Sequence, residues 1–269
     1  MQNGSVNTLS IFTEMGACTR ATTAQKVEQD MIKEHIVSAF DRDLEHIQGL
    51  VLRMGGLVEV ALRDSVIALE TGDLELAAQV RDGDRQIDEL EERIRAEVER
   101  LIALRAPTAS DLRTVMSVLS ISNVLERCGD YARNIAKRTQ ILEEFQYAST
   151  LTGTLRRMSR HVEAMISDAL DSYVHRDVER AEDVIARDLE ADQMYNSLFR
   201  ELLTHMMEDP HVISHCMHLH FIAKNIERAG DHATNLAEQT IYLVTGHLPD
   251  EDRPKQDLSS ISMPRRNHG

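Results

Sequence analysis

The sequence contains no Trp, and aromatic residues make up only 4% of its 269 positions. Glycine and proline are also scarce, with 12 and 5 residues. A β-sandwich or a Rossmann domain would need more turn glycines and more β-branched runs. Ala, Leu, Ile, Glu, Asp and Arg dominate instead, and this composition is typical of long amphipathic helices. Apolar residues account for 42%, which is enough for a hydrophobic core.

Positive charge is in short supply as well. The chain has 30 Lys and Arg residues against 45 Asp and Glu residues, which gives a formal net charge of −15. Binding to nucleic acid needs a basic face, and none stands out here. Unaided binding to an anionic membrane is disfavoured for the same reason. The charge suits the binding of cations or of a basic protein surface.

The sequence lacks the marks of an exported or membrane-spanning protein. Its three cysteines, Cys18, Cys128 and Cys216, have neither the spacing of a disulfide framework nor that of a metal site. No run of about 18 apolar residues could span a bilayer. The first thirty residues have neither the basic start nor the apolar centre of a signal peptide. We therefore expect a reduced, cytoplasmic setting.

One segment occurs twice in the chain. Residues 126–136 read E-R-C-G-D-Y-A-R-N-I-A and residues 227–237 read E-R-A-G-D-H-A-T-N-L-A, so seven of eleven positions are identical at an offset of 101. Further matches precede this segment at an offset of 104, among them Asp84 with Asp188 and Asp88 with Asp192. A loop between helices absorbs the small change in offset. Each half is about a hundred residues, which is right for a domain and too long for a solenoid repeat.

Apolar residues recur at helical spacing in three segments of each half. The expected helices cover about 31–71, 73–104 and 108–145, and then about 151–174, 178–207 and 212–244. Gly55-Gly56 interrupts the first of them without a polar loop, which indicates a close helix contact or a soft spot.

Short connections make successive helices antiparallel. The predicted fold is therefore all-α, with two tandem, pseudo-symmetric three-helix bundles. We place the first bundle at 31–146 and the second at 147–246, and we expect disordered segments at 1–30 and 247–269.

Each half carries two pairs of acids spaced four residues apart, and this spacing puts both members of a pair on one helix face. The pairs are Asp84 with Asp88, Glu126 with Asp130, Asp188 with Asp192, and Glu227 with Asp231. A pair on the second helix of an antiparallel bundle can lie across from a pair on the third. Four crowded carboxylates repel one another, and a hard cation held by oxygen ligands removes that cost. The sequence thus predicts one site per half for Mg, Mn, Ca or iron.

The neighbours of these acids leave alternatives open. Acidic pairs are common on solvated helix faces, and it is their repetition in both halves that favours a site. Arg127 and Arg228 would orient the carboxylates, bind a phosphate-like anion, or form plain salt bridges. Gly129 and Gly230 lie within helices, where glycine costs about 1 kcal/mol relative to Ala. They indicate a close helix approach or room at the site.

Together these residues resemble the PhoU family, the accessory regulators of bacterial phosphate-specific transport. The resemblance covers about 31–246. It includes R-M-G-G-L-V-E at 53–59, P-T-A-S-D-L-R at 107–113, E-R-C-G-D at 126–130, H-M-M-E-D at 205–209 and I-E-R-A-G-D at 226–231. It implies two three-helix bundles that form a homodimer. It also implies that the four acidic pairs bind clusters of divalent or trivalent metal ions, such as iron, manganese or magnesium.

The resemblance further implies a non-catalytic negative regulator of phosphate uptake and phosphate-starvation signalling. Such a protein is cytoplasmic and peripheral to the inner membrane. It contacts the ATPase of the phosphate ABC transporter and the sensor histidine kinase of the phosphate two-component system. Two alternatives stay open: a metal-dependent, phosphate-processing enzyme, which would need a general base beside an open metal site, and a structural adaptor without metal.

Overall fold

The structure is a computed structural model that describes residues 8–142 and 149–249, with side chains over 39–142 and 151–249. The elements are α1 (Thr8–Thr71), α2 (Leu74–Arg105), α3 (Ser110–Leu142), α4 (Ser149–His175), α5 (Val178–Glu208), the short 3₁₀ helix η1 (Pro210–Val212) and α6 (Ile213–Thr245). No residue within the described ranges belongs to a strand. The all-α prediction is confirmed.

Matching caps open the second helix of each half. The side chain of Asp73 accepts a hydrogen bond from the backbone N–H of Leu76 at 2.9 Å and so begins α2. Asp177 does the same for Arg180 at 3.1 Å and begins α5. An aspartate at this position satisfies a backbone donor that the helix leaves unpaired. The duplication in sequence therefore extends to the local structure of the turns.

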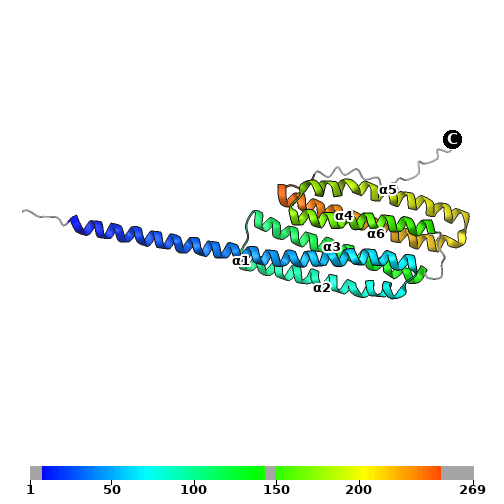
Figure 1. Cartoon of the computed structure of the whole chain (residues 1–269), viewed down its shortest axis with the longest axis horizontal. Coiled ribbons are helices and arrows are strands. Elements are labelled where there is room, and N and C mark those ends of the chain that lie inside the picture. Colours follow the sequence, from blue (N-terminus) through cyan, green and yellow to red (C-terminus); the bar gives the residue numbers. More distant parts are fainter. Residues whose placement is uncertain (1–7, 143–148, 250–269) are drawn as a thin grey trace, which may run out of the picture.

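The beginning of α1 differs from the prediction. We expected a disordered segment before Met31, but α1 begins at Thr8 and projects as a single helix beyond the bundles (Figure 1). The residues between these points include no proline, and Ala, Gln, Glu, Lys and Met among them favour helix. Residues 1–7 and 250–269 lie outside the described part of the chain, as does the predicted boundary at 146/147.

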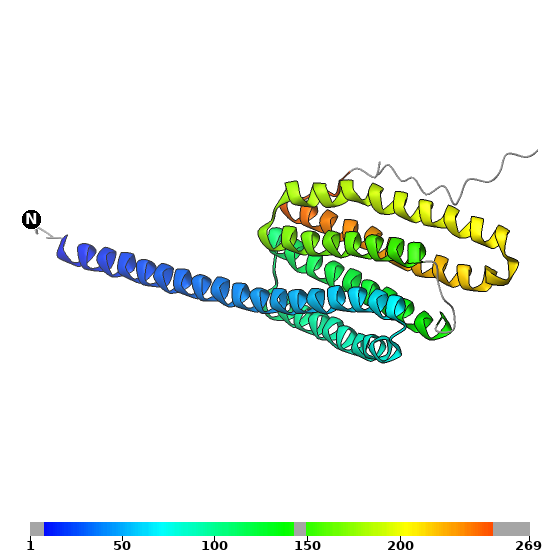
Figure 2. The same cartoon turned by 45° about the vertical axis from the view of Figure 1, so that its right-hand side comes forward.

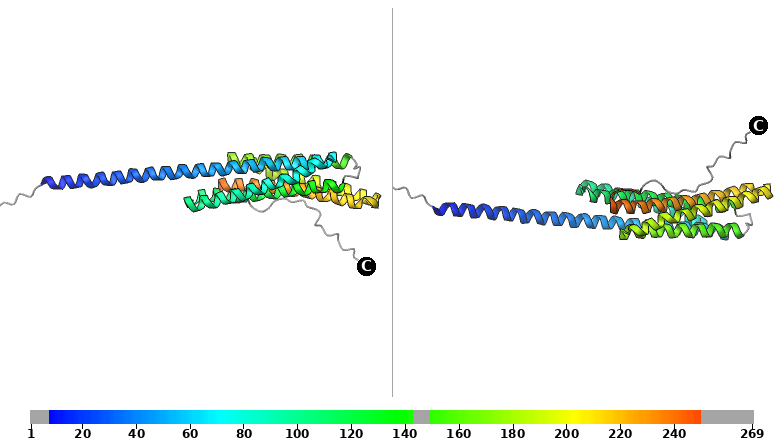
Figure 3. Two further views of the ribbon diagram at one scale, coloured as in Figure 1. Left: turned by 90° about the horizontal axis from the view of Figure 1, so that it is seen from below. Right: turned by 90° about the horizontal axis from the view of Figure 1, so that it is seen from above.

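The six helices form two bundles, α1–α3 and α4–α6, which lie side by side along one long axis (Figures 2 and 3). The bundles meet where α1 packs on α4 and α3 packs on α6. Each interface helix thus contacts its own counterpart in the other half, as a pseudo-two-fold axis requires. Tyr131 and His232 occupy equivalent positions, and Tyr131 Oη lies 3.1 Å from His232 Nε2. The axis therefore passes between these two side chains.

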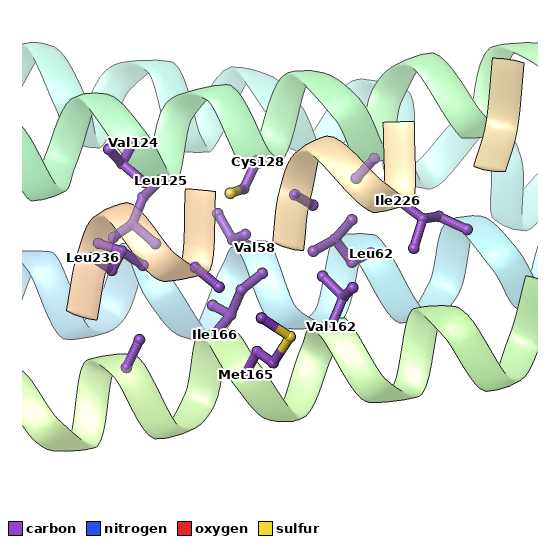
Figure 4. Close-up of a cluster of buried hydrophobic side chains, with 14 of the residues drawn as sticks. Val58, Leu62, Val124, Leu125, Cys128, Val162, Met165, Ile166, Ile226 and Leu236 are labelled. Atoms are coloured by element: carbon purple, nitrogen blue, oxygen red, sulfur yellow. The ribbon is translucent and has the colours of Figure 1, made fainter. Parts of the chain in front are cut away.

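The two bundles share one continuous hydrophobic core. Figure 4 shows side chains of α1, α3, α4 and α6 in a single cluster, including Val58, Leu62, Leu125, Cys128, Val162, Met165, Ile166 and Ile226. All of these are at most 1% exposed, so the interface between the bundles is as well buried as the interior of each. No helix in the described ranges combines the length and the apolar character that crossing a membrane requires.

Gly55 lies where α1 approaches α4. The helix continues through Gly55 and Gly56, and a Cβ built on Gly55 would lie 2.4 Å from Leu170 Cδ1. A Cβ on the neighbouring Gly56 would meet nothing within 4 Å. The interpretation of this dipeptide as a close helix contact is confirmed for Gly55.

Candidate metal sites between α2 and α3 and between α5 and α6

In the first half, acids of α2 and α3 come together as the spacing predicts. Arg133 of α3 donates hydrogen bonds to Asp84 of α2 and to Asp130 of its own helix. Asp84 is only 4% exposed, so its carboxylate is held in the interface between the helices. The guanidinium thereby joins one acid from each predicted pair.

A polar hollow of about 500 Å³ opens beside these residues. Its lining consists of acids, arginines and one amide: Asp88, Glu91, Glu92, Glu126, Asp130, Arg95, Arg127, Arg133 and Asn123. Three of the four predicted acids of this half therefore face one space. Glu91, which is 9% exposed and pairs with Arg95, is not among the acids predicted from the sequence. Arg133 was not predicted either, although its position one turn after Asp130 could have indicated the contact.

In the second half, the acids of α5 and α6 are more deeply buried. Glu227 is 5% exposed, Asp192 7% and Asp188 9%. Glu227 Oε1 accepts a hydrogen bond from Lys224 Nζ at 2.8 Å. Glu227 Oε2 is buried and has no hydrogen-bond partner among the described residues. An orphaned, buried carboxylate oxygen is costly and is a natural ligand for a hard cation.

Gly129 and Gly230 lie where the third helix of each half approaches an aspartate of the second helix. A Cβ on Gly129 would lie 3.0 Å from Ile87 Cδ1 and 3.4 Å from Asp84 Oδ1. The equivalent Cβ on Gly230 would lie 3.6 Å from Asp188 Oδ1. Gly129 therefore serves close packing, as one of the two interpretations drawn from the sequence has it, whereas a Cβ on Gly230 would be at ordinary contact distance from its neighbours.

The acids of both sites are partly desolvated and lie close to other acids. Burial, more than any other cause, raises the pKa of Asp84 and of Glu126, and the charge on Asp88 raises both further. Burial also raises the pKa of Glu227, with further contributions from Asp231 and Asp192 and an opposing one from Lys224. Ionised carboxylates in these positions cost free energy that a cation would relieve.

The described side chains form no ready-made set of three or more His, Cys, Asp or Glu ligands around a single point. The acids of each half lie near one another, but they do not surround a single point. The oxygen-only donor set and the orphaned Glu227 Oε2 nevertheless fit a hard cation in the second half. In the first half, the guanidinium of Arg133 is ion-paired with both Asp84 and Asp130, so a positive charge already lies beside these two acids.

Replacing Glu227 with Gln is expected to stabilise the metal-free protein at alkaline pH. An acid whose folded-state pKa is raised lowers stability as the pH rises from its unfolded-state pKa to its folded-state pKa, and the loss is complete above the folded-state pKa and absent below the unfolded-state pKa. The difference in Tm between Glu227→Gln and wild type should therefore be positive at alkaline pH. It should shrink as the pH falls toward the ordinary glutamate value of 4.5. Thermal unfolding in chelator across this range measures it, and a difference that does not depend on pH would contradict the assignment.

Comparison with known proteins agrees with the fold and the duplication. A family model described as the PhoU domain matches residues 51–139 and again 155–240. A protein of Caulobacter vibrioides named phosphate-specific transport system accessory protein PhoU homolog is 46% identical over 227 residues, which are 84% of this chain and 99% of that protein.

Two solved structures are also similar. PhoU from Pseudomonas aeruginosa is 40% identical with a TM-score of 0.75, over 77% of this chain and all of that one. The phosphate transport system regulatory protein PhoU from Streptococcus pneumoniae is 31% identical with a TM-score of 0.73, over 78% of this chain and 99% of that one. With a duplicated family domain, a matching fold and this degree of identity, the chain belongs to the PhoU family.

Proposed function

We propose that this protein restrains phosphate uptake and phosphate-starvation signalling as a metal-binding adaptor of the phosphate-specific transport system. The observation that carries the proposal is the convergence of duplicated acids at equivalent places in two bundles, within a family whose members are named transport accessory proteins. Such names fit an adaptor rather than an enzyme. The protein would act in the cytoplasm, peripheral to the inner membrane through its partners.

The bound metal would serve structure and recognition. Asp84, Asp88, Glu126 and Asp130 would hold it in the first half, and Asp188, Asp192, Glu227 and Asp231 in the second. Magnesium, manganese and iron all accept such oxygen ligands. When bound, the metal neutralises the crowded carboxylates. Through these acids the metal would link the second and third helices of each bundle.

Exposed apolar residues support docking on other proteins. Leu112 and Met116 of α3 are 39% and 50% exposed, and their counterparts at an offset of 101, Ile213 and Met217 of α6, are 44% and 38% exposed. Met116 precedes Arg127 by eleven residues, about three helical turns, so the two share one side of α3. We call these four residues the apolar pairs. Exposed apolar groups beside charges are typical of protein interfaces.

The transporter ATPase and the sensor histidine kinase are the proposed partners, and a second copy of the chain is a third. The net charge of −15 favours a partner with a basic surface. Apolar contact would supply affinity, and charge would speed association.

Capture from cells tests the proposed partners. Tagged protein is expected to retain the transporter ATPase and the sensor kinase, and to lose them as salt rises. The screening length falls from about 8 Å at physiological ionic strength to about 3 Å at 1 M. Changing Met116 and Met217 to Asp should abolish capture, whereas Val174→Asp on α4, at a position that is 47% exposed, should not. Mass spectrometry of the captured proteins measures this. Equal capture by the double variant would reject the apolar pairs as the docking surface.

A further inference from the structure

A groove runs between α1 and α2 on the face of the first bundle, beside Gly83. It has a volume of about 220 Å³, and its lining combines apolar side chains such as Val60 and Val80 with the acid Asp64. A Cβ built on Gly83 would meet no atom of the described residues within 4 Å. Gly83 therefore leaves this space open, although glycine weakens the interior of a helix.

The repeat shows what stands at the equivalent place in the second half. At the offset of 104, Arg187 corresponds to Gly83, and Asp168 corresponds to Asp64. Arg187 Nη2 on α5 donates a hydrogen bond to Asp168 Oδ2 on α4 at 2.6 Å, and the arginine side chain is only 27% exposed. An arginine side chain thus bridges the first two helices of the second half where the first half has an open groove.

A second contact differs between the halves in the same way. Arg180 of α5 pairs with Asp171 of α4 at 2.7 Å, whereas the corresponding residues of the first half are Leu76 and Ile67. Leu76 lines the groove, and Ile67 is 38% exposed. The first half therefore has neither arginine, but it retains one of the two acids, Asp64.

Asp64 can accept a further partner. Its side chain is 26% exposed, and Arg63 Nε, on the neighbouring residue, lies 3.2 Å from its Oδ1. The Arg63 side chain is 52% exposed, and ion pairs at such exposed positions are weak. This contact uses Oδ1 and leaves Oδ2 to an incoming donor.

We propose that the groove beside Gly83 receives an arginine side chain of another protein, with Asp64 as its counter-ion. The inference rests on the proposed adaptor role for its partner, and it does not involve the metal sites. Apolar walls suit the aliphatic stem of arginine. The planar guanidinium can pair with a carboxylate through two N–H donors, which an ammonium group cannot do in the same geometry. The net charge of −15 favours the basic surface that would carry this arginine.

The test is a titration of the full chain with N-acetyl-arginine N-methylamide, followed by nuclear magnetic resonance. Backbone amide signals of Gly83 and its neighbours should shift and saturate, and the lysine analogue should bind at least a few-fold more weakly. Asp64→Asn should weaken binding by about tenfold or more, because a hydrogen bond to a charged acceptor is lost. Asp82→Asn is the matched control, since Asp82 is an exposed acid beside Gly83 that does not line the groove, and it should leave the affinity unchanged.

Gly83→Arg gives the first half the arginine that the second half already has. It should abolish probe binding and raise the Tm by about 2–4 °C, because it replaces a glycine within a helix and pairs with Asp64. Gly83→Ala should also raise the Tm, but it should retain probe binding within a few-fold of wild type. This pair of variants separates occupation of the groove from a change in helix stability.

The outcomes distinguish this inference from the adaptor role. Probe binding that survives Gly83→Arg, or equal binding of the two probes, would overturn the inference and leave the adaptor role standing. Self-association of wild type that Gly83→Arg abolishes would identify a second copy as the occupant and would also overturn it. Normal phosphate uptake in a deletion strain would instead reject the adaptor role without changing probe binding.

Discussion

Cells that lack this protein are expected to take up phosphate without restraint in phosphate-rich medium and to keep their phosphate-starvation genes expressed there. The chain belongs to the PhoU family, whose members include named phosphate transport accessory proteins, and it presents duplicated acidic pairs and exposed apolar pairs. The proposed adaptor would act by binding, so its loss would free the transporter and the kinase.

Uptake of radioactive phosphate and a reporter for a starvation gene measure the two effects of deletion. The strain must carry no second copy of the gene. Normal repression together with normal uptake in the deletion strain would contradict the proposed function and favour the enzyme alternative.

Replacing Gly55 with Leu is expected to destabilise the protein by about 1–3 kcal/mol. A Cβ at this position already lies 2.4 Å from Leu170 Cδ1, and Leu170 is only 5% exposed. Additional carbon atoms in a packed interface force side chains off their rotamers or push helices apart. Because the contact joins α1 to α4, the substitution is expected to weaken the packing between the two bundles. Chemical denaturation gives the free energy of unfolding directly.

The adjacent residue, Gly56, provides a control with the same glycine-to-leucine substitution. A Cβ on Gly56 has no neighbour within 4 Å, so Gly56→Leu should fit without strain. Removing a glycine from a helix interior should even raise stability by about 0.5–1 kcal/mol. Equal effects of the two substitutions would show that the bundles do not pack together closely at Gly55.

The sequence predicted the helices and the acidic pairs because both depend on local spacing. The helical spacing of apolar residues and the i, i+4 acids at Glu126 and Asp130 need no knowledge of the partner helix. Repetition then indicated which acids could form a site. The eight predicted ligands remain a prediction, since bound metal is what would test them.

Other features depend on how the helices pack and could not be predicted in the same way. Arg133 reaches Asp84 on another helix, and its counterpart Thr234 turns back to its own backbone. The continuous core also depends on which faces of α1 and α4 meet, which periodicity does not specify. The start of α1 at Thr8 differs from the expected disorder before Met31 because the apolar pattern of 8–30 is weak, although the composition there favours helix.

We propose that the acidic sites connect metal binding to the restraint of phosphate uptake. This connection is tested by phosphate uptake in the deletion strain carrying either the wild-type gene or one encoding Glu227→Gln with Asp231→Asn, at equal protein levels. Wild type is expected to restore restraint, and the variant is expected to leave uptake as high as in the deletion strain. Full restoration of restraint by the variant would contradict the proposed connection.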